Sequence, residues 1–82
     1  MKLTIISPQS KHSYSVQWIE AQTSAGALII KPRHAPMILS LVAGSELSFM
    51  LSNHEKKIIG LMRPCFLEVS RTEVIALVGQ DL

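Results

Sequence analysis

Apolar residues in this 82-residue chain recur with a period of two, not with the 3.6-residue period of an amphipathic helix. Leu3 and Ile5 share a face in the opening segment, and Cys65, Leu67 and Val69 share a face near the other end. Successive side chains of a strand point to opposite faces, so this alternation is typical of strands with one buried face. The sequence therefore predicts an all-β protein.

Eight short segments fit this strand pattern, and turn signals separate them at regular intervals. They lie at residues 2–7, 14–21, 27–30, 37–42, 46–51, 57–62, 65–69 and 73–78. Segment 37–42 also fits a helix, but it is too short for an ordinary one, and we predict a strand. We expect a single domain over residues 1–82, folded as a small antiparallel β-sandwich of about eight to ten short strands.

The second predicted strand contains a change of phase. Tyr14, Val16 and Trp18 are expected to share one face, after which Ile19 and Ala21 take up the opposite parity. A slip of one residue within a strand indicates a β-bulge or a sharp bend.

Composition excludes some classes of function. The net charge is +2, and the basic residues are scattered instead of being clustered with aromatics, so we predict no nucleic-acid partner. The longest stretch without a charged side chain runs from His34 to Ser45, which is too short to cross a bilayer. We expect no direct membrane insertion. A small chain that is 48% hydrophobic favours hiding part of its surface against a protein partner.

Residues that could carry chemistry do not form a recognisable constellation. The possible metal ligands His12, His34, His54 and Cys65 lie far apart, whereas structural zinc sites use close pairs. Cys65 is in phase with core positions, and the glycines do not form a phosphate-binding loop. We predict no catalytic residue, no metal site, no cofactor and no nucleotide binding, and hence no enzyme.

The segment "KPRHAP", residues 31–36, places two prolines around a histidine. Pro32 and Pro36 each push the preceding residue toward an extended conformation, so the connection has little freedom. His34 is either a catalytic or metal-binding residue or a side chain that hydrogen-bonds to nearby backbone, and we favour the second interpretation. Fixed loops on β-scaffolds are also common binding surfaces.

Residues 25–36, "AGALIIKPRHAP", followed by Gly44, by "FLEV" at 66–69 and by "VIAL" at 74–77, resemble a known family. The chain is similar, over its whole length, to the N-terminal β-sandwich of the epsilon subunit of F-type ATP synthases. The opening "LTIISP" at 3–8 fits the first strand of that family. The resemblance is to a short form that lacks the C-terminal helical hairpin.

The resemblance implies a ten-stranded sandwich without a catalytic site. It implies a rotor-stalk subunit that binds the gamma subunit and the membrane rotor ring, and so helps to couple proton flow to ATP synthesis. Such a subunit would be peripheral, on the cytoplasmic side of the inner (plasma) membrane. The alternatives are a divergent paralogue in another rotary ATPase and a stand-alone β-sandwich adapter.

Some positions depart from the family pattern. Ala25 and Ala27 replace acidic residues, Arg33 replaces a glycine, and Pro64 and Cys65 replace a glycine pair. We expect Lys31, Arg33 and His34 to form a loop that faces the rotor ring, with the altered residues around Gly26 on the same docking surface. We expect Trp18 to anchor the gamma subunit, unless it lies in the core.

Overall fold

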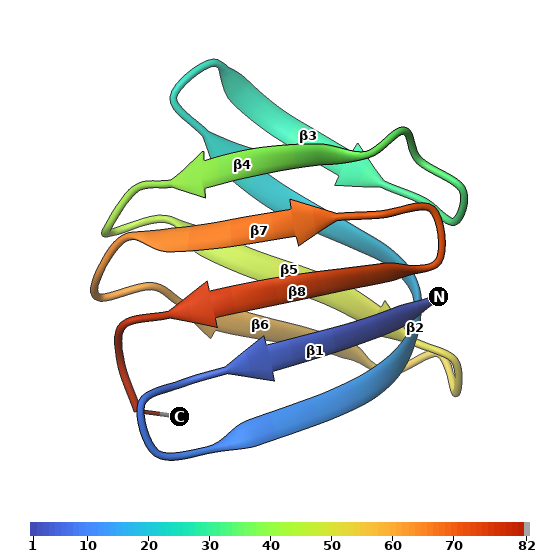
Figure 1. The fold of residues 1–82 in the computed structure, drawn as a ribbon, viewed down its shortest axis with the longest axis horizontal. Coiled ribbons are helices and arrows are strands. Elements are labelled where there is room, and N and C mark those ends of the chain that lie inside the picture. The colour runs from blue at the N-terminus through green and yellow to red at the C-terminus, as the bar shows by residue number, and fades with distance from the viewer. Residues whose placement is uncertain (82) are drawn as a thin grey trace.

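The eight predicted strands are all present in the computed structural model, which describes residues 1–81 and contains no helix within them (Figure 1). Their bounds are β1 Lys2–Ile6, β2 Lys11–Thr23, β3 Gly26–Ile30, β4 Met37–Leu41, β5 Glu46–Leu51, β6 Lys56–Gly60, β7 Cys65–Val69 and β8 Glu73–Val78. The ambiguous segment before Gly44 is a strand, as predicted. The strand count agrees with the alternation in the sequence, and it is two fewer than the resemblance implied.

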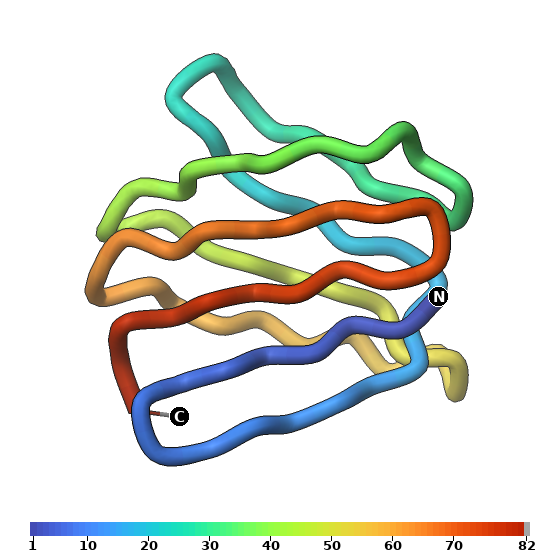
Figure 2. The backbone as a smooth tube through the Cα atoms, viewed as in Figure 1, coloured from blue at the N-terminus to red at the C-terminus, as the bar shows by residue number. Residues whose placement is uncertain are grey.

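The strands form two layers that pack face to face (Figures 1 and 2). The front layer has the order β4-β7-β8-β1 and ends in the first half of β2, while the back layer contains β3, the second half of β2, β5 and β6. Strand β2 therefore belongs to both layers. The predicted β-sandwich is confirmed.

The passage of β2 between the layers coincides with the predicted bulge. β2 pairs with β1 up to Ser15 and with β5 from Val16, and its register with β5 shifts between Val16 and Trp18. The shift reverses the parity, so that Val16 and Ile19 are both buried. The expectation that Trp18 shares a face with Val16 is therefore wrong, because the extra residue turns Trp18 outward.

One strand pair departs from the antiparallel expectation. β1 and β8 run parallel, from Lys2 opposite Glu73 to Ile6 opposite Leu77. The other strand pairs within residues 1–81 are antiparallel. A parallel pair needs a long connection, and here nearly the whole chain lies between the two strands.

The inward faces of the two layers form one core. Its buried apolar residues are Leu3, Ile5, Val16, Ile19, Ala21, Ile30, Leu41, Leu47, Phe49, Leu61, Cys65, Leu67, Val69, Val74, Ala76 and Val78. Phe49 is fully buried and contacts the ring of Tyr14, with 5.2 Å between the ring centroids. The prediction that Cys65 is a small core residue is confirmed. Burial of each larger side chain contributes about 1.5–3 kcal/mol.

Residues 1–81 include no helix with the length and apolar character needed to cross a bilayer.

Candidate functional site

Residues Lys31–His34 form a tight turn between β3 and β4. The amide of His34 donates to the carbonyl of Lys31 at 3.2 Å, Pro32 occupies the second position, and Arg33 at the third has φ 68°. This combination is that of a type II turn, whose third residue needs a positive φ. Glycine adopts a positive φ without steric cost, so Arg33 is an unusual residue for this position.

Two further hydrogen bonds hold this turn in place. The Arg33 amide donates to the carbonyl of Arg71, in the β7–β8 turn, at 2.9 Å. The Nδ1 atom of His34 lies 2.8 Å from the carbonyl oxygen of Ala35, so Nδ1 carries the proton and donates. The prediction that His34 bonds to nearby backbone is confirmed. Lys31, Arg33 and Arg71 are all exposed, and they give this end of the molecule positive charge.

The turn at 31–34 and the turn around Gly26 lie at opposite ends of β3 (Figure 1). Five residues of strand separate them, which corresponds to about 16 Å. The sequence-based expectation of one docking surface that contains both turns is therefore wrong. A flat partner at one end of the molecule cannot contact both turns.

Trp18 lies half-buried on the outer face of the back layer. It is opposite Met50 of β5, and the Nζ atom of Lys56 lies 5.8 Å from its ring centroid. Trp18, Ile29 and Lys31 line a hollow of about 270 Å³. The structure thus rules out a core role for Trp18 and brings it close to Lys31, one of the residues expected at the rotor ring.

Sequence reasoning missed a second apolar surface, on the outer face of the front layer. Ile38, Phe66 and Leu77 have exposed fractions of 77%, 51% and 47%. Phe66 lies opposite Leu77, and Ile38 lies two residues along the sheet, opposite Glu68. We call these three residues the front apolar face. The sequence did contain an indication of this face. Phe66 and Leu77 alternate with the buried residues of their strands, at positions where polar residues are usual.

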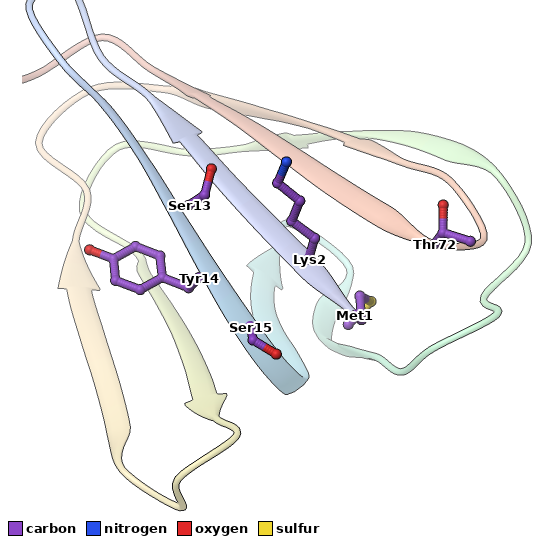
Figure 3. Close-up of a pocket in the computed structure, with 6 residues that line it drawn as sticks. All are labelled: Met1, Lys2, Ser13, Tyr14, Ser15 and Thr72. Carbon is purple, nitrogen blue, oxygen red and sulfur yellow. The ribbon is translucent and has the colours of Figure 1, made fainter.

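A hollow of about 490 Å³ beside the N-terminus contains several hydroxyl groups (Figure 3). Lys2, Ser13 and Thr72 point to one side of the sheet, and Tyr14 points away from them. The hydroxyl of Thr4 lies 3.2 Å from Ser13 Oγ and donates to Glu73 Oε1 at 3.2 Å. Thr4, Ser13 and Glu73 therefore form a small hydrogen-bonded cluster without a general base such as histidine, which an activated serine or threonine nucleophile would need.

The remaining chemical groups are dispersed. Burial raises the pKa of the Cys65 thiol to about 11, so the thiol stays protonated near neutral pH and is a poor nucleophile. Within residues 1–81, His, Cys, Asp and Glu side chains do not gather in threes as a metal centre would need. The features of this structure that suggest a role are surfaces for other proteins: the turn at 31–34, the Trp18 hollow and the front apolar face.

Solved structures share this fold. A chain of the Euglena gracilis mitochondrial ATP synthase, in a cryo-EM structure of OSCP, F1 and the c-ring in rotational state 1, has a TM-score of 0.82 at 16% identity. A chain of the Tetrahymena thermophila mitochondrial ATP synthase, in a structure of the central stalk and c-ring, has a TM-score of 0.75 at 16% identity. Each match covers 98% of this chain, which spans 51% and 63% of the length of those chains.

No curated protein sequence matches this chain significantly. The family model for the β-sandwich domain of the ATP synthase delta/epsilon chain matches residues 1–80. That match covers nearly every residue, and it agrees with the two-layer fold. This chain belongs to the family of ATP synthase delta/epsilon chain β-sandwich domains.

Proposed function

We propose that this protein is a non-catalytic subunit of the central stalk of an ATP synthase. In this role it binds a gamma subunit and the membrane rotor ring, and it helps to couple proton translocation to ATP synthesis. The observation that carries the proposal is the family match over residues 1–80. The similar solved chains come from ATP synthase assemblies that include a c-ring, which supports the same role. The subunit would be peripheral, on the cytoplasmic side of the inner membrane.

The gamma subunit needs an apolar surface on this domain, and two are available. Trp18 is the anchor on the back layer, because tryptophan is among the residue types most enriched in interface hot spots and this one lies half-buried on an outer face. The front apolar face is the competitor, because three large apolar side chains there are about half exposed or more. The two surfaces are on opposite layers, so one flat partner covers only one of them.

The experiment measures the affinity of the purified domain for a cognate gamma subunit by calorimetry. We expect Trp18→Ala to weaken binding by about 2 kcal/mol or more, roughly 30-fold, while the circular dichroism spectrum stays unchanged. Gln17→Ala, at the exposed neighbour of Trp18, is the control. If Phe66→Ser with Leu77→Ser weakens binding and Trp18→Ala does not, the gamma subunit covers the front apolar face. No complex with any gamma subunit would overturn the proposed role.

The rotor ring contacts one end of the domain, and we propose the end with Lys31, Arg33 and His34. Like charges across an interface oppose association, so the polar loop of the ring should be acidic or neutral there. Lys31→Glu with Arg33→Glu should slow association with the rotor at low salt, and the difference should vanish at high salt. Ala25→Glu with Ala27→Glu, at the far end of β3, is the control for position, and Lys31→Gln with Arg33→Gln at the turn changes the net charge by the same amount as that control. An effect confined to the control pair would mean that the ring contacts the opposite end.

A further inference from the structure

One side of the sandwich is open, between the first half of β2 and β6. A hollow of about 640 Å³ lies there, and we call it the seam. His12 and Tyr14 line it from β2, and Lys57 and Ile59 line it from β6. All four lie on the inner face of their strands, because residues directly opposite each other in a ladder share a face and each of the four is opposite a buried core residue. His12 and Lys57 are exposed there, because this side of the sandwich is open.

Strand β6 is at the edge of its layer, since within residues 1–81 it pairs with β5 alone. Leu61 directs its amide and carbonyl toward the β4–β5 turn, where they bond to Ser45 and Gly44. Backbone groups alternate in direction along a strand, so those of Gly60, Ile58 and Lys56 face the free edge. An edge of this kind can accept an additional strand.

The side chain of Gln80 already bonds to this edge as a peptide group would. Its Oε1 accepts from the amide of Met62, and its Nε2 donates to the carbonyl of Gly60 at 2.9 Å. A single residue of a neighbouring parallel strand makes the same two bonds, one to each side of the residue it faces. The free edge of β6 is thus shaped to bind amides. Gln80 occupies one end of the edge, and the groups of Ile58 lie beyond it.

The side chains around this edge favour a particular partner. Lys57 and His12 line the seam, no carboxylate does, and the Nζ atom of Lys57 is 5.9 Å from the Tyr14 ring centroid. An added strand would place an inward side chain beside Lys57, where a carboxylate is favoured. Its outward neighbour would lie against Ile58, which is 56% exposed and favours an apolar contact. A second copy of this chain would offer Lys56, Lys57 or an apolar residue of its own β6 to Lys57, and no carboxylate, so it lacks the charge that the seam favours.

We propose that the free edge of β6 accepts an extended segment of another polypeptide, with an acidic residue opposite Lys57 and an apolar residue opposite Ile58. Main-chain hydrogen bonds to Ile58 supply affinity, and the seam supplies specificity for the acidic side chain. The inference does not depend on a role in a rotary stalk, because it rests only on the edge and its charges.

The probe is a capped seven-residue peptide of alternating valine and glutamate, titrated into the whole domain and followed by NMR. We expect it to bind at least about tenfold more tightly than a matched valine–lysine peptide, a difference of about 1.4 kcal/mol. Hydrogen exchange of the Ile58 amide should slow by about tenfold or more, because that amide becomes paired. The Ile59 amide, which already faces β5, should not change.

Two adjacent lysines provide the matched variants. Lys57 points into the seam and Lys56 lies over Trp18 on the outer face, so Lys57→Glu and Lys56→Glu change the net charge equally. We expect Lys57→Glu to weaken binding of the valine–glutamate peptide by about tenfold or more, and Lys56→Glu by less than about threefold. Lys57→Gln serves in place of Lys57→Glu if the latter unfolds.

Three outcomes would overturn the proposal. The first is a valine–glutamate peptide that fails to bind below about 1 mM. The second is an equal loss of affinity in the two lysine variants, which would indicate only a general charge effect. The third is a Lys57→Gln domain that self-associates while no peptide binds. Lys57 would then prevent edge-to-edge association of the domain and would not recognise a partner.

Discussion

Replacing Arg33 by glycine should stabilise the domain, although it removes a large side chain. Arg33 has φ 68° in the turn before β4. A hydrogen bond from the Arg33 amide to the Arg71 carbonyl holds the backbone in that conformation. A left-handed conformation costs a residue with a Cβ atom about 1–2 kcal/mol. Glycine avoids that cost but loses more conformational entropy on folding, about 0.5–1 kcal/mol. The expected net gain in unfolding free energy is therefore about 0.5–1 kcal/mol.

The assay is urea unfolding with thermal unfolding as a second measurement. A gain of this size should raise the Tm by about 2–8 °C for a domain of this length, with the urea m value unchanged. Arg33→Ala separates the backbone from the side chain, because alanine retains the Cβ atom and should give no gain. His54→Gly, at the other positive φ of a non-glycine residue (70°), should gain less, since histidine tolerates this region better than most residues.

The reasoning would be refuted by an Arg33→Gly domain that is no more stable than the Arg33→Ala domain. A gain in unfolding free energy from Arg33→Gly would also indicate a functional role for the arginine side chain. A residue that makes its own turn less stable is retained in many proteins because its side chain contacts a partner. The Arg33→Gly variant should then be the more stable protein and also bind the rotor ring more weakly.

Further changes test the fold and its core. Gly44→Ala should lower the unfolding free energy by about 1–2 kcal/mol, because Gly44 has φ 87°, whereas Gly60→Ala, with equally open space and no positive φ, should be close to neutral in urea unfolding. Leu67→Ala should cost about 2–5 kcal/mol in the same assay, since the side chain is fully buried between the layers. The unfolded Cys65 thiol loses its proton above about pH 9 and the buried thiol only near pH 11, so its contribution to stability is complete below pH 9 and declines as the pH rises from 9 to 11. Urea unfolding across that range should show a steeper decline for the parent domain than for Cys65→Ala, and parallel declines would contradict the raised pKa.

The strands and the core were predictable because a period of two leaves a direct mark in a sequence. Leu67 and Val69 of β7 show this, since their alternation with Glu68 gave the buried face correctly. The orientation of Trp18 was not predictable, because the position of the extra residue in β2 depends on the pairing with β5, and that pairing is non-local. The parallel pairing of β1 with β8 was not predictable either, because it joins strands from opposite ends of the chain.

The candidate surfaces were predictable in part. The two prolines indicated a fixed turn at His34, and the local hydrogen bond of that histidine followed from its side-chain chemistry. The separation of Lys31 from Gly26 required the direction and length of β3, which a charge comparison along the sequence does not include. The free edge of β6 could not be inferred at all, because an edge is a property of the whole sheet.

The parallel pair of β1 and β8 has a mechanical consequence. The two strands lie side by side and point the same way, with the N-terminus at the start of one and the C-terminal residues after the end of the other (Figure 1). A pull between the two ends of the domain would slide β1 along β8, and every hydrogen bond between them would carry load at once. Bonds loaded together resist more force than bonds that open one after another, as they do when a hairpin is peeled apart. The topology thus lets the domain resist a pull applied between its two ends.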